Sequence, residues 1–223
     1  MNLSLEGKNA VICGSTQGIG LAIAEELALL GANCTLIARN EDALKTAIQN
    51  LDVALRQQHQ YLIADFNKPD ELKKTMEAFV ENHKVHILVN NSGGPAAGPI
   101  TDATEEAFLN TFSQHLICNH ILTKAVVPSM KAEGYGRIIN IISTSVKIPL
   151  KNLGVSNTIR GAVASWAKTM ANELGQFNIT VNNVLPGFTA TQRLTSLIEN
   201  IAKKGNTVVE MIEQNMKAEV PMK

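Results

Sequence analysis

Apolar residues along the chain follow two patterns that alternate. Short apolar runs predict six strands, at residues 9–13, 32–38, 61–64, 86–89, 136–142 and 179–184. Between the first two runs, Ile19, Ile23, Leu27 and Leu30 recur at helical spacing, and Gly31 follows as a C-cap. Further helices are expected at 41–55, 69–82, 105–131 and 153–175, and two amphipathic segments at 194–216. This alternation is typical of an α/β domain with a parallel sheet.

A glycine-rich turn joins the first expected strand to the first expected helix. Residues 14–20 have G-x-x-x-G-x-G spacing, which differs from the general dinucleotide pattern G-x-G-x-x-G. A helix N-terminus offers free N–H groups to a pyrophosphate, and glycines keep side chains out of the way. Tight packing of strand and helix is the alternative explanation. Six residues are expected to border the dinucleotide: Gly14, Ser15, Gln17, Gly18, Ile19 and Gly20.

The end of the second expected strand indicates which dinucleotide binds. A carboxylate there would bond the ribose 2′-hydroxyl of NAD and repel a 2′-phosphate. The chain has Arg39 and Asn40 at this point and no acid before Glu41. Because the Arg39 guanidinium suits a phosphate, we expect NADP. NAD is the alternative if Arg39 only stacks on adenine or lies in solvent.

Hydroxyl-bearing residues follow the fifth expected strand. Its apolar run stops at Ser143, Thr144 and Ser145. Thirteen residues after Ser143 comes Ser156, and Arg160 follows four residues later. Positions i and i+4 share a helix face, so Ser156 and Arg160 are expected to point the same way, opposite a strand end at Ser143.

Over nearly its whole length the chain resembles the short-chain dehydrogenase/reductase family, in particular 3-oxoacyl-acyl-carrier-protein reductases. The resemblance implies a doubly wound Rossmann domain with parallel strand order 3-2-1-4-5-6. It also implies hydride transfer between NADP(H) and a carbonyl or alcohol substrate, with 3-oxoacyl thioesters as one candidate class. In the family a catalytic Ser precedes Tyr-x-x-x-Lys. Here Ser143 matches that Ser, whereas Ser156 replaces the Tyr and Arg160 replaces the Lys.

The resemblance assigns further cofactor contacts. Asp65, followed by Phe66, matches an acid that commonly bonds the adenine amino group, with a plain turn residue as the alternative. Residues 90–93 read Asn-Asn-Ser-Gly and resemble the signature Asn-Asn-Ala-Gly, whose small residues pass close to the cofactor ribose. The remaining expected contacts are Asn90, Ser92, Gly93, Pro186, Gly187, Thr189 and Thr191.

The source of the catalytic proton is the open question. Tyr61 and Tyr135 lie at the N-terminal ends of expected strands, whereas ligands of open α/β sheets lie at the C-terminal ends. His115 falls where the family usually has an Asn that holds a water, and imidazoles titrate near neutral pH. A structural His is the alternative.

Two mechanisms therefore stay open. In the first, Ser143 polarises the substrate oxygen, Arg160 holds the ribose, and a proton arrives through Ser156, water or His115. In the second, the fold is retained and catalysis is lost, which leaves a cofactor-binding sensor or a partner subunit.

Composition excludes several other classes of function. The chain has 20 Lys and Arg against 20 Asp and Glu, and this balance provides no electrostatic footprint for nucleic acid or an anionic membrane. Cys13, Cys34 and Cys118 lack metal-site spacing, so we expect buried free thiols in a reducing compartment and no metal. No signal peptide and no apolar run near about 18 residues is visible, which favours a cytoplasmic protein.

The last expectations concern domain organisation and assembly. We expect one Rossmann domain over residues 1–223, with a helical insertion around 190–217 that covers the substrate. In the family the two long helices pair between subunits, so a homodimer or homotetramer is expected. Family members normally continue beyond 220–223 through another helix and a seventh strand, which this chain is expected to lack.

Overall fold

A computed structural model describes residues 3–205 and 207–218 of the chain. The expected chain end at 220–223 lies outside the described residues. Two compact units can be distinguished, Met1–Leu185 and Pro186–Lys223.

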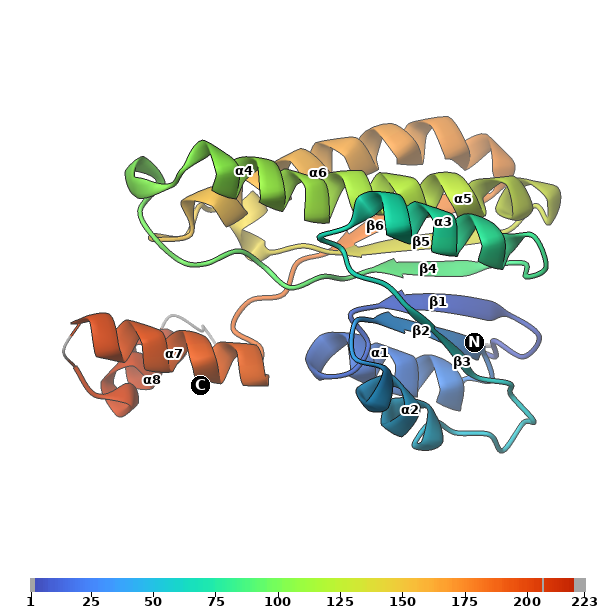
Figure 1. Cartoon of the computed structure of the whole chain (residues 1–223), viewed down its shortest axis with the longest axis horizontal. Coiled ribbons are helices and arrows are strands. Elements are labelled where there is room, and N and C mark those ends of the chain that lie inside the picture. The colour runs from blue at the N-terminus through green and yellow to red at the C-terminus, as the bar shows by residue number, and fades with distance from the viewer. Residues whose placement is uncertain (1–2, 206, 219–223) are drawn as a thin grey trace. The chain divides into compact units, whose positions relative to one another are not determined.

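The first unit contains a parallel sheet in the order β3-β2-β1-β4-β5-β6, which confirms the predicted strand order (Figure 1). The strand order reverses between β1 and β4, and ligands of such sheets bind at the C-terminal ends near this reversal. The strands are β1 (Asn9–Cys13), β2 (Asn33–Ala38), β3 (Gln60–Ile63), β4 (Ile87–Asn90), β5 (Gly136–Ile141) and β6 (Ile179–Val184).

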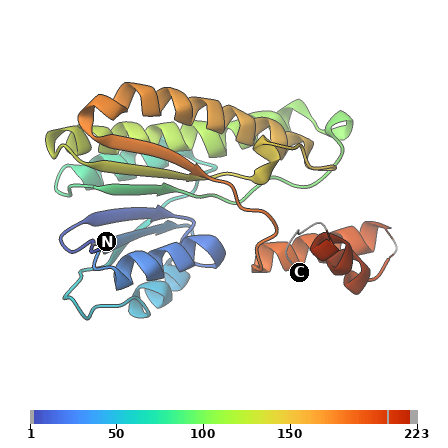
Figure 2. The same cartoon turned by 180° about the vertical axis from the view of Figure 1, so that it is seen from behind.

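Helices cover both faces of this sheet. One face carries α1 (Gly18–Leu29) and α2 (Glu41–Gln49). The other carries α3 (Pro69–Val80), α4 (Glu105–Phe112), α5 (Cys118–Ala132) and α6 (Gly154–Leu174), as Figure 2 shows from behind. Short helical turns lie at η1 (Ile100–Asp102), η2 (Ser113–Ile117), η3 (Thr144–Val146) and η4 (Gly175–Phe177).

Each face of the sheet has its own apolar core. Ile12 and Leu36 pack with Ala24 and Leu44 on the α1–α2 face. On the other face the core includes buried residues of β1, β4, β5 and β6 together with α3, α5 and α6: Val11, Leu88, Ile138, Val181, Leu72, Leu122 and Ala167. Because strands of a doubly wound sheet are covered on both sides, they read as apolar runs without alternation.

The three cysteines belong to these cores. Cys13, Cys34 and Cys118 are free and buried, as expected. Burial raises the pKa of each thiol to about 12. The thiolate is the reactive form of cysteine, so these thiols are protected in the folded protein.

The predicted C-cap at Gly31 is confirmed by its hydrogen bonds. Gly31 has φ +97° and donates to Ala28 O at 2.8 Å, while Ala32 donates to Leu27 O at 2.9 Å. This pair of bonds forms a Schellman motif, which glycine enters without a Cβ penalty. The motif turns the chain from α1 into β2.

Two expected helices differ in the structure. The helix expected at 41–55 ends at Gln49, because Asp52 accepts a hydrogen bond from Ala54 N and Arg56 adopts φ 63°. Leu51 is buried although it lies outside the helix, so the apolar spacing made the helix look longer than it is. The helix expected at 105–131 is divided into α4 and α5 by the π-helical turn η2.

A row of asparagine side chains crosses three strands. Asn90 Nδ2 donates to Asn140 Oδ1 at 2.9 Å, and Asn140 Nδ2 donates to Asn183 Oδ1 at 3.0 Å. These residues are direct register partners in β4, β5 and β6. We call them the asparagine ladder. Asn90 and Asn140 are buried, so the ladder pairs Asn90 Nδ2 and both polar atoms of Asn140 where water cannot reach them, while Asn90 Oδ1 has no partner within the described residues.

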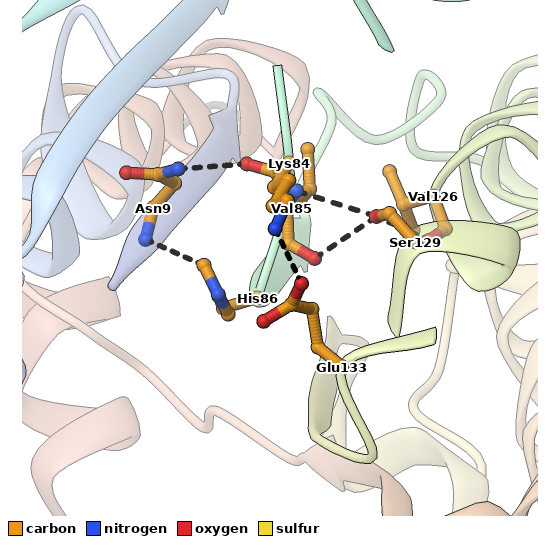
Figure 3. A network of polar contacts seen from close by, with 7 residues as sticks. All are labelled: Asn9, Lys84, Val85, His86, Val126, Ser129 and Glu133. Atoms are coloured by element: carbon orange, nitrogen blue, oxygen red, sulfur yellow. Dashed lines mark hydrogen bonds and ion pairs between the residues drawn. The ribbon is translucent and has the colours of Figure 1, made fainter. Parts of the chain in front are cut away.

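Another polar network joins β1, the start of β4 and α5 at the N-terminal end of the sheet (Figure 3). His86 Nδ1 accepts a hydrogen bond from Asn9 N at 3.0 Å, and Lys84 Nζ donates to Glu133 Oε1 at 2.6 Å. Burial, reinforced by the nearby Lys8, lowers the pKa of His86. An acceptor at Nδ1 fits a neutral imidazole, so this end of the sheet depends on an uncharged histidine.

The second unit contains α7 (Gln192–Gly205) and α8 (Val209–Ala218). Thr191 Oγ1 accepts from Leu194 N at 3.4 Å at the start of α7, and Thr207 N donates to Ala202 O at 3.0 Å after its end. Ile198 and Ala202 are buried. Over the described ranges of both units, no helix combines the length and the apolar character that crossing a bilayer requires.

Candidate functional site

The turn between β1 and α1 ends in a helix N-terminus whose N–H groups are not capped. Gln17 at the N-cap position makes no side-chain capping bond within the described residues, and the first turn of α1 carries no acid. In contrast, the N-cap residue of α2, Asn40, accepts a hydrogen bond from Ala43 N at 3.0 Å. The uncapped end and its dipole suit an anion, so this turn fits the pyrophosphate of a dinucleotide.

The glycines of this turn are also required by packing. A Cβ on Gly20 would lie 2.1 Å from Gly14 O, and one on Gly14, at φ +57°, would lie 2.8 Å from Asn91 O. Asn91 Nδ2 donates to Cys13 O and Gly14 O, both at 3.2 Å. Tight packing and pyrophosphate binding are therefore compatible explanations of the same glycines.

Ser15 adds a polar group to the turn. It is fully buried, and within the described part of the chain its Oγ has no hydrogen-bond partner. Buried hydroxyls are normally paired, so an unpaired one in a glycine turn points to a ligand or water at this position. Ser15 therefore fits the predicted dinucleotide site.

The ends of β2 and β3 present one cation and one anion. Arg39 is exposed directly after β2. Asp65 lies after β3, and its Oδ1 accepts from Asn67 N at 3.0 Å and Asn67 Nδ2 at 2.8 Å. Burial acts to raise the pKa of Asp65, but the Asn67 hydrogen bonds and the nearby Arg39 and Lys68 outweigh it and lower the pKa.

Asp65 and Phe66 thus have structural roles in the described chain. The Asn67 bonds form the turn that was the alternative explanation of Asp65. Phe66 packs against the apolar core, and its main-chain oxygen accepts from Cys118 Sγ at 3.4 Å. Contact of either residue with adenine stays a prediction.

The residues of the signature at the end of β4 lie in three different environments. The Asn90 side chain is buried in the asparagine ladder. Ser92 Oγ lies 2.9 Å from His115 Nδ1. A Cβ built on Gly93 would meet no described atom within 4 Å, which leaves its backbone open to a neighbour. The ladder holds the end of β4, while Ser92 and Gly93 lie beyond it.

His115 lies in the π-helical turn η2. Its side chain is 1% exposed, and Cys118 N donates to Ser113 O across the wide turn. Such single π-helical turns are frequently found at functional sites. Because η2 packs against α6, His115 belongs to the same side of the sheet as Ser156 and Arg160.

Ser143 directly precedes η3, and α6, which carries Ser156 and Arg160, packs against η3. Ser143 lies two residues after β5 in extended conformation, and its Oγ accepts from Ser145 N at 3.1 Å. Arg160 Nη1 donates to Ile141 O, the last residue of β5, at 2.8 Å. Ser156 lies one helical turn before Arg160 on α6 and is partly buried.

The two tyrosines have other partners. Tyr61 donates its hydroxyl to Glu41 Oε1 at 2.9 Å. The ring of Tyr135, which precedes β5, is covered by Lys8 Nζ at 4.3 Å and Arg137 Cζ at 4.2 Å. Neither tyrosine hydroxyl is therefore expected to be the catalytic acid, and another group must supply the proton.

Four expected cofactor contacts lie in the second unit. Pro186, Gly187 and Thr189 precede α7, and Thr191 caps that helix through Oγ1. Thr191 Oγ1 also donates to Thr189 O at 3.3 Å. Their predicted contact with the nicotinamide stays a prediction.

One residue that organises the site was not singled out from the sequence. Asn91 joins the end of β4 to the glycine turn through its amide. The signal was present, since Asn91 lies inside the recognised signature. Only the register of β1 with β4 shows that its amide reaches Cys13 and Gly14.

Comparison with known proteins gives one consistent result. The family model for short chain dehydrogenase matches residues 8–202. A tropinone reductase homolog of Arabidopsis thaliana is 33% identical over 190 residues, 84% of this chain and 70% of that relative. D-beta-hydroxybutyrate dehydrogenase of Rhizobium meliloti is 32% identical over 221 residues, 97% of this chain and 85% of that protein.

A solved structure extends the match to three dimensions. L-sorbose reductase from Gluconobacter frateurii, complexed with NADPH and L-sorbose, has a TM-score of 0.90 at 29% identity. The match covers 100% of this chain and 85% of that one. The likeness thus includes both the sequence and the complete described fold.

Proposed function

The chain belongs to the short-chain dehydrogenase family, and on that premise we propose that it is an NADP-dependent reductase of small carbonyl compounds. Two observations support the choice of NADP. Arg39 follows β2 where a carboxylate would select NAD, and L-sorbose reductase was solved with NADPH. NAD is the weaker alternative, because a solvated Arg39 would not select against it.

The cofactor, when bound, supplies a hydride to the carbonyl carbon of the substrate. Residues of this chain must then hold the cofactor, polarise the carbonyl and provide a proton. The uncapped N-terminus of α1 and the buried hydroxyl of Ser15 fit the pyrophosphate. Gly14 and Gly20 keep that turn free of side chains.

Ser143 is the residue that polarises the substrate oxygen. Its Oγ accepts one hydrogen bond from Ser145 N, which holds the oxygen in place and leaves the hydroxyl proton available for donation. Donation to the carbonyl oxygen withdraws electrons from the carbon and stabilises the negative charge that develops on oxygen.

Arg160 supports the same step by position and charge. Its Nη1 donates to Ile141 O, which holds the guanidinium near the end of β5. A guanidinium suits ribose hydroxyls and a developing oxyanion. Because arginine stays protonated, it cannot donate the proton that the reaction consumes.

The proton comes from Ser156, from His115 or from a water that either residue holds. An aliphatic hydroxyl such as Ser156 is a weak acid and serves best as a relay. Histidine changes charge near neutral pH and is the stronger candidate for the group that loses and regains the proton. The packing of η2 against α6 is what supports placing His115 in this step.

The single observation that carries the proposal is the contact between α6 and the end of β5. The Arg160–Ile141 bond supports it, because this bond joins α6 to the end of β5, two residues before Ser143. The test is NADPH consumption by purified protein with a panel of 3-oxoacyl thioesters, sugars and cyclic ketones, followed by nicotinamide absorbance. Ser143→Ala is the control, and the proposal predicts stereospecific consumption that this control nearly abolishes.

A cofactor-binding protein without turnover is the second candidate. The replacement of Tyr by Ser156 and of Lys by Arg160 favours it, because a serine hydroxyl is far less acidic than a phenol. NADPH binding without consumption of any panel substrate would support a sensor or a partner subunit. We further propose that residues 190–217 cover the substrate and that the assembled protein is a homodimer or homotetramer.

A further inference from the structure

Ser92 and His115 form a contact between two departures from the family pattern. Ser92 Oγ and His115 Nδ1 lie 2.9 Å apart, although 23 residues separate them in sequence. Ser92 stands where the signature has Ala, and His115 stands where an Asn is usual. Because these two unusual residues hydrogen-bond to each other, they are expected to act together in the chemistry of the site.

The surroundings of the pair restrict its movement. Asn91, next to Ser92, is bonded to Cys13 O and Gly14 O. His115 is 1% exposed and lies in a π-helical turn that packs against α3, α4 and α6. Ser92 is thus fixed from the strand side and His115 from the helix side.

A serine hydroxyl has a property that the usual alanine lacks. It can donate to Nδ1 when the neutral ring carries its proton on Nε2, and it can accept from Nδ1–H when the ring is charged. Rotation about the Cβ–Oγ bond is sufficient to change between the two. A histidine that loses and regains a proton in each turnover therefore keeps this partner throughout.

We propose that Ser92 is a positioning residue for His115 and holds the imidazole in one orientation in both of its protonation states. His115 then provides the proton that reaches the substrate oxygen during carbonyl reduction. The inference rests on the proposed function. It adds a specific role for Ser92 and identifies the Ser92–His115 pair as the replacement for the missing phenol.

The first test is a mutant cycle on turnover. The variants are Ser92→Ala, Ser92→Thr, His115→Asn and the double variant Ser92→Ala/His115→Asn, each checked for NADPH binding and thermal unfolding. Ser92→Ala should lower kcat about tenfold or more, which is part of the hundred- to ten-thousandfold that a general acid contributes, and this loss should exceed any change in the KM for NADPH. Ser92→Thr keeps a hydroxyl and should recover most of kcat.

The cycle separates positioning from a general structural effect. In the His115→Asn background, Ser92→Ala should cause no further loss of kcat, because no imidazole remains to be oriented. An equal loss in both backgrounds would overturn the proposal. So would a Ser92→Thr variant that is as impaired as Ser92→Ala while both bind NADPH normally.

The second test does not depend on activity. Nitrogen-15 NMR of labelled imidazoles reports which ring nitrogen carries the proton, and the His115 signals are assigned by their loss in His115→Asn. Wild type should show one tautomer, Ser92→Thr the same, and Ser92→Ala a mixture. An unchanged spectrum in Ser92→Ala would contradict the inference.

The two tests distinguish this inference from the proposed function. If wild type reduces carbonyls and Ser92→Ala resembles it in kcat and in spectrum, the reductase proposal stands and the role of Ser92 is wrong. If Ser92→Ala changes the tautomer but wild type consumes no NADPH with any substrate, the pair is only structural, and both the reductase proposal and the positioning role are rejected.

Discussion

Arg160 Nη1 donates to the main-chain oxygen of Ile141 at 2.8 Å, two residues before Ser143. This bond joins the middle of the site helix α6 to the strand end that carries the expected substrate hydroxyl. A lysine has a single terminal nitrogen, whereas the planar guanidinium can bind Ile141 and still present donors to a ligand. The replacement of Lys by Arg160 therefore changes how the site is held together while its positive charge is kept.

The first prediction concerns Ser143. Ser143→Ala removes one donor to the developing oxyanion and should lower kcat about a hundredfold or more, with NADPH binding unchanged. Steady-state kinetics on the best panel substrate measures this effect. Ser165→Ala, an exposed serine on the same helix as Ser156, is the matched control and should behave as wild type.

The second prediction concerns the two replaced catalytic positions. Ser156→Tyr combined with Arg160→Lys restores the Tyr-x-x-x-Lys spacing on α6. A phenol near a lysine has a lowered pKa and is a better acid than an aliphatic hydroxyl, so carbonyl reduction should rise or at least persist. Arg160→Ala alone should weaken both NADPH binding and turnover.

The double variant also decides between the two candidate functions. If wild type and double variant both bind NADPH normally and neither consumes it, the site is not shaped for hydride transfer. The cofactor-binding protein then becomes the better description of this chain.

The third prediction concerns cofactor choice. Arg39 is exposed directly after β2, so Arg39→Ala should weaken NADPH binding and leave NADH binding nearly unchanged. Titration of nicotinamide fluorescence gives both dissociation constants. Lys124→Ala, an exposed cation on α5, is the control for a general change in charge. Equal affinity of wild type for the two cofactors would rule out selection by Arg39.

The fourth prediction concerns assembly. Phe112 and Ile117 are 38% and 36% exposed on the α4–η2 segment, where the family resemblance places a subunit interface. We expect at least a dimer at micromolar concentration, and Phe112→Glu should shift it toward monomer because it places a charge in an apolar contact. Light scattering measures the mass. Leu29→Glu, at a 58% exposed apolar residue of α1, should leave the mass of wild type unchanged.

The fifth prediction concerns acid stability. The pKa of His86 is lowered in the fold, so the unfolded chain binds the proton more tightly. The free energy of unfolding should therefore be highest above the ordinary value of 6.5 and fall as pH drops from there toward the lowered folded value. Urea unfolding at several pH values measures this dependence.

Replacement of His86 tests the assignment. His86→Asn offers an oxygen acceptor to Asn9 N without a titrating group, so its unfolding should depend less on pH. His120→Asn changes an exposed imidazole on α5 and serves as the comparison. An equal pH dependence of wild type and His86→Asn would show that other groups cause it.

The strands and the glycine turn were predictable from local rules, whereas the order of the strands was predicted from the family resemblance. Apolar runs mark strands that are buried on both faces, and a strand followed by a helix returns to a parallel neighbour by a right-handed crossover. The i, i+4 relation of Ser156 and Arg160 needed only a helix at that position. Their approach to Ser143 stays a prediction, supported by the bond from Arg160 to Ile141.

The pairing of Ser92 with His115 could not be predicted in the same way. A π-helical turn adds a residue to the helix, and the apolar period that indicates a helix does not show where the extra residue lies. The face on which His115 lies therefore depends on packing. The turn formed by Asp65 and Asn67 was open for a similar reason, because a carboxylate at a strand end can serve a turn or a ligand.

The asparagine ladder also fixes the position, along the strand direction, at which the catalytic loops leave the sheet. A parallel strand that slipped by two residues would keep the same face buried but move about 6.6 Å along its neighbour. It would also break a buried amide pair, at about 1–3 kcal/mol for each unsatisfied group. Asn90 and Asn140 are in register, and Ser92 and Ser143 follow them by two and three residues. The ladder thus fixes where both hydroxyls lie along the strand direction relative to each other, although none of its three amides needs to touch the substrate.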